Sequence, residues 1–200
     1  MSIVQQKQVK EEHFIPPDYK EPESGGGTYL KPKAGETHRL RIMGSFEYPV
    51  TAVMGWESWA EDEEGNQHPE RREYNHDGYD ELTEIDRDGK PKHFWLFQIY
   101  HIDSKEPQLW SITQRTIQRQ IRQFVENPNW GNPRNYNLAV TREGEGLQTK
   151  YSVVAEPPIE PPSDLMIEIM KEAKIDCREI FRNENPFGAL TDGEHDDLPF

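Results

Sequence analysis

The chain has 200 residues, of which 33% are hydrophobic and 30% are charged, and it contains 16 Pro and 14 Gly. This composition allows one hydrophobic core with much of the chain outside it. No apolar run approaches the roughly 20 residues that cross a bilayer. The single cysteine, Cys177, excludes an intramolecular disulfide and a multi-cysteine metal cluster. The polar N-terminus lacks the apolar segment of a signal peptide, so we expect a soluble protein of the cytoplasm.

The formal net charge of −14 argues at first against a nucleic-acid ligand, but the charge is unevenly distributed. Residues 57–88 hold 13 acids and three arginines, and residues 183–200 hold five acids and neither Lys nor Arg. Residues 90–155 hold nine Lys or Arg and five acids. The sequence therefore predicts a basic body between acidic segments, and such a body can bind a polyanion locally.

The elements expected along the chain begin with a flexible N-terminal arm over residues 1–27, which is rich in Pro and Gly. Residues 57–91 are charged and lack an apolar period, so we expect a long acidic loop there. Residues 157–182 are expected to form a Pro-rich linker and a short helix, and residues 183–200 a disordered acidic tail. Apolar patterning predicts strands over 37–43, 48–56, 93–103, 108–112, 136–142 and 149–155.

A helix is predicted between the strand over 108–112 and the strand over 136–142. It begins after a cap at Ser111 or Thr113 and ends near Glu126. At about 100° per residue, its apolar side chains share one face, and the opposite face carries Arg115, Arg119 and Arg122. This arginine stripe is typical of an ordinary solvated helix face, and it also suits contacts with phosphates.

The order of the elements places this helix between the third and fourth main strands. That order is typical of the OB-fold, so we predict a mainly β (α+β) domain over residues 28–156, built as a five-stranded OB-fold barrel. An α+β sandwich of the same elements is the alternative.

Single strands of nucleic acid are bound without sequence readout by aromatic faces that stack bases and by cations along the backbone. The candidates for stacking lie on or beside the second and third strands and are Trp56, Trp59, Trp95, Phe97 and Tyr100. The candidates for phosphate contacts are Arg39, Arg41, Lys90, Lys92 and Arg115. For each of these aromatic side chains, packing in the core is the alternative interpretation.

The chain ends in an acidic run with a short apolar tip, Asp196-Asp197-Leu198-Pro199-Phe200. We interpret this tip as a docking peptide in which the Phe ring fills a small pocket and the aspartates steer towards a basic rim. The same negative charge can fold back onto the basic body and compete with DNA. The alternative is a tail that only keeps the chain soluble.

The tip resembles the Asp-Asp-Ile-Pro-Phe end of bacterial single-stranded-DNA-binding proteins, with Leu in place of Ile. Separately, the body over residues 29–155 resembles the phage-encoded single-stranded-DNA-binding proteins. The matching segments are Tyr29–Glu36, Gly55–Trp59, Gly89–Trp95, Ile112–Gln114, Trp130–Pro133 and Thr141–Leu147. These resemblances imply an OB-fold that binds single-stranded DNA during phage replication, recombination or repair. They also imply a tip that recruits a polymerase, helicase or nuclease.

We therefore expect a binding protein without catalysis, cofactor or metal ion, and the sequence leaves monomer and homodimer open. The histidines lack the regular spacing and the cysteine partners of a metal site, and no P-loop, dinucleotide or nucleophile motif is present. Two alternatives stay open. One is an adaptor or DNA mimic that occupies a host nucleic-acid-binding protein, and the other, ranked last, is a metal-dependent nuclease.

Overall fold

The computed structural model describes residues 28–74 and 91–200. Three sequence-based expectations fall outside these residues: the N-terminal arm over 1–27, the second part of the acidic loop over 75–90, and Lys90 as a phosphate contact. Within the described ranges, no helix combines the length and the apolar composition that crossing a membrane requires.

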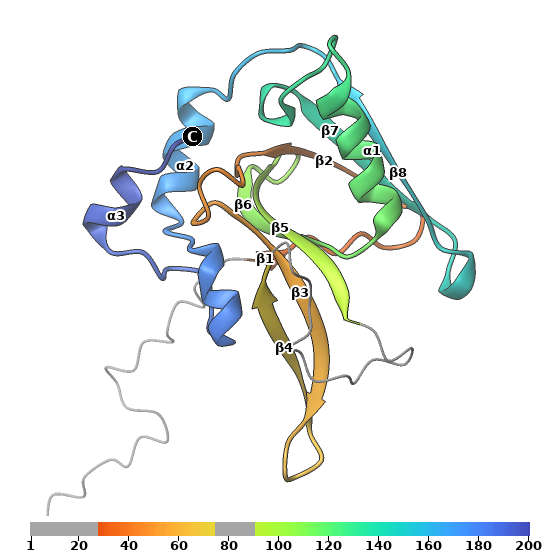
Figure 1. Cartoon of the computed structure of the whole chain (residues 1–200). Helices are drawn as coiled ribbons and strands as arrows, with labels where there is room; N and C mark the ends of the chain where they lie inside the picture. Colours follow the sequence, from red (N-terminus) through yellow and green to blue (C-terminus); the bar gives the residue numbers. More distant parts are fainter. Residues whose placement is uncertain (1–27, 75–90) are drawn as a thin grey trace, which may run out of the picture.

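Eight strands form the sheet of the described residues (Figure 1). Their order is β1-β6-β5-β2-β7-β8, and β3 pairs with both β5 and β4. Only the pairing of β1 with β6 is parallel among these strands. The prediction of a mainly β chain is confirmed. The strands are β1 (Thr28–Tyr29), β2 (Thr37–Ile42), β3 (Ala52–Glu61), β4 (Gln67–Glu73), β5 (Lys92–His101), β6 (Glu106–Ile112), β7 (Asn137–Glu143) and β8 (Lys150–Glu156).

The strands β2 and β3 lie along the same edge of β5 and behave as one strand with an excursion. Ile42 of β2 stands opposite Ile99, and Ala52 of β3 stands opposite Phe97 two residues further along β5. The segment between the two strands leaves the edge of β5 and then returns to it. Its two ends approach each other at Gly44, where a Cβ atom would lie 2.0 Å from the carbonyl oxygen of Thr51. Glycine is therefore required for this close approach of two backbone segments.

The first part of the segment predicted as a long acidic loop is a β-hairpin, so that prediction is wrong as far as Glu73. The Asp62 carboxylate builds the turn by accepting hydrogen bonds from the N–H groups of Asn66 at 2.8 Å and Glu64 at 2.9 Å. The hydrogen bonds from Asn66 lower the pKa of Asp62. Polar and charged side chains project from both faces of the outer hairpin, which removes the apolar alternation that identifies strands in a sequence.

The helix α1 (Arg115–Glu126) lies between β6 and β8, which do not pair with each other in the described residues. Gln118 donates to the carbonyl oxygen of Ile112 on β6 at 2.9 Å. On the other side, the Gln120 amide oxygen accepts from the N–H of Val153 at 2.7 Å, and its nitrogen donates to the carbonyl oxygen of Tyr151 at 3.3 Å. The two glutamines thus take up backbone groups that a neighbouring strand would otherwise bind.

The prediction of a closed five-stranded barrel is therefore wrong, because α1 occupies the place of a strand-to-strand closure. The predicted position of the helix, between the third and fourth main strands, is correct. Its apolar face, with Ile117 and Ile121, packs into the core between the sheet and the helix. Short 3₁₀ helices, η1 (Pro133–Asn135) and η2 (Gly146–Gln148), flank β7.

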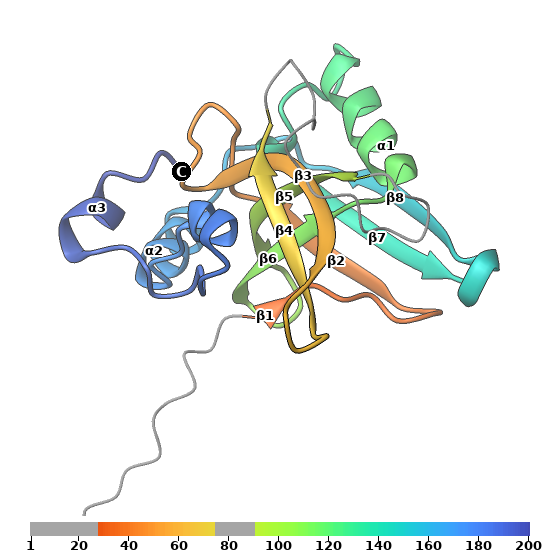
Figure 2. The same ribbon diagram turned by 60° about the horizontal axis from the view of Figure 1, so that its bottom comes forward.

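The opposite face of the sheet is covered by the C-terminal segment, so that α1 lies on one side of the sheet and α2 and α3 lie on the other (Figures 1 and 2). This segment contains α2 (Asp164–Glu172), the 3₁₀ helix η3 (Cys177–Arg182) and α3 (Asp192–Asp196). It closes a second core in which Phe94 and Leu96 of β5 contact residues around η3. Both faces of β5 are therefore buried.

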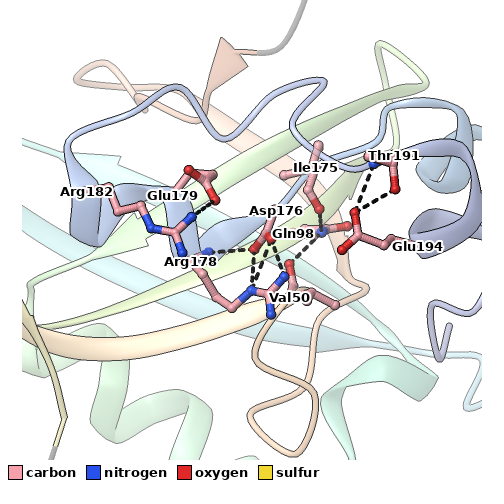
Figure 3. Close-up of polar contacts among 9 residues, drawn as sticks. All are labelled: Val50, Gln98, Ile175, Asp176, Arg178, Glu179, Arg182, Thr191 and Glu194. Atoms are coloured by element: carbon pink, nitrogen blue, oxygen red, sulfur yellow. Dashed lines mark hydrogen bonds and ion pairs between the residues drawn. The ribbon is translucent and has the colours of Figure 1, made fainter.

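Gln98 of β5 anchors the C-terminal segment (Figure 3). Its side chain is fully buried, and its nitrogen donates to the carbonyl oxygens of Ile175 at 2.8 Å and Val50 at 3.1 Å. Asp176 then caps η3 by accepting from the N–H of Arg178 at 2.8 Å. The burial of Cys177 beside this cap raises the pKa of its thiol, so Cys177 is a packing residue.

The prediction of a disordered tail over residues 183–200 is also wrong. Leu190 is 4% exposed and Leu198 is 7% exposed. Near α3, Glu194 accepts hydrogen bonds from the hydroxyl group of Thr191 at 2.8 Å and from its N–H at 3.1 Å, which lowers the pKa of Glu194. Single apolar residues separated by polar ones anchor this segment, and such a pattern has no period from which a sequence can predict order.

We predict that Gln120→Leu destabilises the fold by about 1–3 kcal/mol, because the N–H of Val153 loses its acceptor in a place from which water is largely excluded. Chemical denaturation measures this change. Gln123→Leu is the matched control, because Gln123 lies on the same helix and is exposed. Its effect should stay within about 0.5 kcal/mol. Equal effects of the two substitutions would show that Gln120 does not close the edge of β8.

Candidate nucleic-acid interface

An open groove of about 380 Å³ lies between α1 and the strands β3 and β5. We call it the aromatic groove. A second, more apolar hollow of about 380 Å³ adjoins it, sharing Trp95 and Arg122 and extending to Phe46 and Arg134. The residues that line the aromatic groove are Trp56, Tyr74, His93, Trp95, Arg115, Gln118, Arg119 and Arg122.

The helical wall of the groove carries positive charge. Arg115, Arg119 and Arg122 are exposed and project from the face of α1 opposite its buried residues. Arg122 donates to the Glu126 carboxylate at 2.7 Å, but both side chains are well exposed, so water and salt weaken this pair. Within residues 28–74 and 91–200, Arg115 and Arg119 make no ion pair. The wall therefore offers guanidinium groups to an anionic ligand.

The opposite wall is aromatic and is set by the register of the sheet. Trp56 of β3 stands opposite His93 of β5, and Met54 stands opposite Trp95, so both indoles project from the same face. The ring centroids of Trp56 and His93 are 5.0 Å apart, and Tyr74 lies 6.4 Å from Trp56 with nearly parallel rings. Both indoles are partly exposed in the groove, which leaves ring surface for a ligand.

Gly55 allows the hairpin to hold Trp56 in this position. A Cβ atom at Gly55 would lie 2.3 Å from the carbonyl oxygen of Arg72 and 2.9 Å from the ring of Phe181. Any larger residue would push β3 away from β4 and from the C-terminal segment. The conformation of the groove wall is thus tied to packing on the other face of the sheet.

His93 forms the floor between the two indoles and brings a group that can titrate. Its Nε2 atom is buried and has no hydrogen-bond partner among the described residues. Burial and, to a smaller extent, the charge of Arg115 lower the pKa of His93 below its ordinary value. The imidazole is consequently neutral at pH 7 and can still gain a proton when an anion comes close.

Of the five aromatic side chains predicted to stack on bases, the structure brings Trp56 and Trp95 together in the groove. Phe97 is only 5% exposed and belongs to the core beneath them. Tyr100 is 4% exposed and packs with Met43 and Met170 on the other face, so its ring offers no accessible surface. Trp59 is 41% exposed, but it is an odd number of residues from Trp56 and projects from the opposite face of β3.

Of the residues predicted to contact phosphates, Arg115 lies in the groove. Arg41 is 2% exposed and is a structural residue, since it donates to Asn137 at 2.8 Å and to the carbonyl oxygen of Glu160 at 2.9 Å. Arg39 pairs with Glu156 at 2.9 Å, at a distance from the groove along β2. Lys92 stands opposite Glu57, on the face of the sheet away from Trp56.

Several groove residues were not predicted as site residues. Arg119 and Arg122 stood out as part of the arginine stripe, but the sequence does not say what the stripe faces. Tyr74 and His93 join the groove through the register of β3 with its neighbours, and Arg72 stands opposite Trp56 on the same face. Cross-strand register is fixed by the whole sheet, so no local signal identifies these residues.

The C-terminal tip is docked on the body. Leu198 is buried, and Phe200 packs against the cluster of Met43, Tyr100 and Met170. Arg134, which lines the apolar hollow beside the groove, donates to the carbonyl oxygen of Pro199 at 2.6 Å. Asp196 and Asp197 remain exposed. The acidic part of the tip therefore faces solvent while its apolar part is covered.

No three His, Cys, Asp or Glu side chains of the described residues come together in a way that would hold a metal ion. Comparison of the chain with protein-family models, with curated protein sequences and with solved structures finds no match.

We predict that Leu198→Ala lowers the free energy of unfolding by about 1–3 kcal/mol, because the substitution removes most of a buried apolar side chain. Leu165→Ala in α2 is the control, since Leu165 is 60% exposed and should tolerate the change. Thermal and chemical unfolding of both variants measure the difference. An unchanged free energy of unfolding for Leu198→Ala would mean that the tip is not docked in solution.

Proposed function

We propose that this protein binds single-stranded DNA without base specificity in the aromatic groove, and that its C-terminal tip recruits proteins of phage DNA replication, recombination or repair. The observation that carries the proposal is the position of two partly exposed indoles, Trp56 and Trp95, across one groove from three exposed arginines. The resemblance of residues 29–155 to phage single-stranded-DNA-binding proteins supports the same role.

The two walls suit the two parts of a nucleotide. Indole faces stack on any base, at about 1–3 kcal/mol for each base, so they bind without reading sequence. Guanidinium groups pair with phosphate oxygens and release counterions from the strand. In a duplex the base faces are stacked on one another, so the aromatic wall favours single strands. The groove thereby accounts for binding and strand selectivity without any catalytic group.

We also propose that the domain is an OB-type barrel in which α1 replaces one strand-to-strand closure. The combined strand β2–β3 pairs with β5 and, through β2, with β7, while β7 pairs with β8. In this proposal β2–β3 is the first barrel strand, and β5, β6, β7 and β8 are the second to fifth. The hairpin of β3 and β4 is then an extension of the loop between the first two strands, where OB-folds bind oligonucleotides.

The tip has to leave its position before a partner can hold it. Leu198 and Phe200 are the side chains that a partner pocket would take, and in this structure they pack against the body. The exposed Asp196 and Asp197 can meet a basic partner first and steer it towards the tip. Recruitment by the tip therefore proceeds as an exchange of one apolar pocket for another.

The test is a titration of intrinsic tryptophan fluorescence with a dT oligonucleotide at several salt concentrations. We expect saturable quenching that weakens as salt rises and is absent with duplex DNA of equal length. Trp56→Ala should weaken binding by about 1–3 kcal/mol through the loss of one stacking face.

The matched control for that substitution is Trp59→Ala, which removes an exposed indole from the opposite face of the same strand and should leave binding unchanged. No quenching at low salt by the folded protein would contradict the proposal and would favour an adaptor that holds no DNA. Equal losses for the two variants would place the DNA elsewhere on the hairpin.

A pH dependence of binding follows from His93. In the free protein, burial and Arg115 hold the pKa of His93 low, and a phosphate that enters between Arg115, Arg119 and Arg122 would raise it. Binding then takes up a proton, so affinity for oligo-dT should rise as the pH falls from about 7.5 to about 5.5. His93→Gln should remove most of that rise, whereas His68→Gln on the outer hairpin should retain it. The same pH profile for both variants would contradict this role of His93.

A further inference from the structure

A second cavity, of about 310 Å³, lies on the other side of the first turn of α1. It is formed where the segment after β1 passes between β6, α1 and the hairpin of β7 and β8. We call it the α1–β8 cavity. The residues that matter for its chemistry are Lys31, Trp110, Ser111, Gln114, Arg142 and Tyr151.

The α1–β8 cavity is basic and contains no carboxylate among its lining residues. Lys31 is exposed at its rim. The Arg142 guanidinium is held by a hydrogen bond of 3.0 Å from Nη1 to the carbonyl oxygen of Pro32. Its Nε atom is buried and has no hydrogen-bond partner among the described residues. Because a buried donor without an acceptor costs free energy, a ligand oxygen that reaches Arg142 would be bound favourably.

The cavity also offers an aromatic surface. Tyr151 of β8 lines it, is partly exposed and packs on the core with its other side. Trp110 is 2% exposed and forms part of the wall, where it supports the cavity without offering a free face. Tyr151 and the two cations thus repeat, on a smaller scale, the pairing of aromatic faces and positive charge in the aromatic groove.

The two sites are adjacent along α1. Arg115 and Gln118 line the aromatic groove, while Gln114 and Ile117 line the α1–β8 cavity. Gln114 and Arg115 are consecutive residues, about 1.5 Å apart along the helix axis and about 100° apart around it, so the two sites lie on neighbouring flanks of the start of α1. A strand that leaves the groove beside Arg115 therefore meets the α1–β8 cavity next.

We propose that the α1–β8 cavity is a second subsite for the same DNA strand, in which Lys31 and Arg142 hold a phosphate and Tyr151 stacks a base. This inference rests on the proposed function, and it extends the binding path around the first turn of α1. Its consequence is that affinity depends on oligonucleotide length in a way that the aromatic groove alone does not explain. Short oligonucleotides fill the groove, and longer ones gain the contacts of the second subsite.

The test compares dT oligonucleotides of about 4 and about 12 nucleotides, which lie within the range of site sizes of OB-folds. The double variant Lys31→Gln/Arg142→Gln should bind the short oligonucleotide as the unmodified protein does and bind the long one about tenfold more weakly. For the long oligonucleotide, the slope of log K against log salt should fall by about 1. Lys33→Gln is the control for lost charge, because Lys33 is two residues from Lys31 and does not line the cavity.

The outcomes separate this inference from the function on which it rests. Failure of the unmodified protein to bind any oligonucleotide overturns both. Normal binding by the unmodified protein, with a double variant that loses no affinity or loses it equally for both lengths, overturns the second subsite alone. Lys31→Gln by itself keeps the test valid if the double variant does not fold, since Lys31 is exposed.

Chemical acetylation of the unmodified protein gives an independent readout. The 12-nucleotide strand should protect Lys31 from acetylation and leave Lys33 reactive, whereas the 4-nucleotide strand should protect neither. Equal reactivity of Lys31 with and without the long strand would overturn the proposal.

Discussion

The insertion of α1 between β6 and β8 determines where the aromatic groove and the α1–β8 cavity lie. The sheet leaves that gap open, and the helix fills it with Ile117 and Ile121 in the core and with the amides of Gln118 and Gln120 on the two strand edges. These contacts fix the rotation of the helix about its axis. Its arginines consequently project towards the groove that β3 and β5 line on the other side. The aromatic groove and the α1–β8 cavity lie on the two flanks of this helix, so both depend on the same contacts.

Burial of both faces of β5 has a second consequence for the site. In a sheet with one free face, Phe94, Leu96 and Tyr100 would be available to a ligand. Here the C-terminal segment covers them, and Gln98 fastens that segment from within the sheet. The partly exposed aromatic surface of β5 is thereby confined to the end of the strand that lines the aromatic groove between α1 and the hairpin. Trp95 lies at that end and remains partly exposed, while Phe97, two residues further along the same face, is buried.

That comparison shows what the sequence could and could not provide. Alternation and helical periodicity predicted the main strands, the helix and its arginine stripe, because those patterns are local. Trp95 and Phe97 are equivalent by the same criteria, and only tertiary packing separates them: Phe97 is a buried member of the core, whereas Trp95 lies at the edge of that core and lines the groove. Arg39 and Arg41 likewise alternate with apolar residues in one strand and share one face. Arg41 is nevertheless buried and donates to the carbonyl oxygen of Glu160. The hairpin over residues 57–73 and the docked tail rest on register and on isolated apolar contacts, which leave no periodic signal.

The register also explains how a chain of net charge −14 can present a basic groove. On the hairpin, Glu57 pairs with Arg71 at 2.8 Å on the face turned towards the C-terminal segment. The opposite face carries Arg72 and its cross-strand neighbour Trp56, which lines the aromatic groove together with the arginines of α1. Because side chains alternate along a strand, Glu57 lies on the face away from Trp56, whereas Glu70 shares the face of Trp56 and Arg72. Among residues 28–74 and 91–200, no acid lines the aromatic groove while three arginines do, so the described wall of the groove is basic although the chain as a whole is acidic.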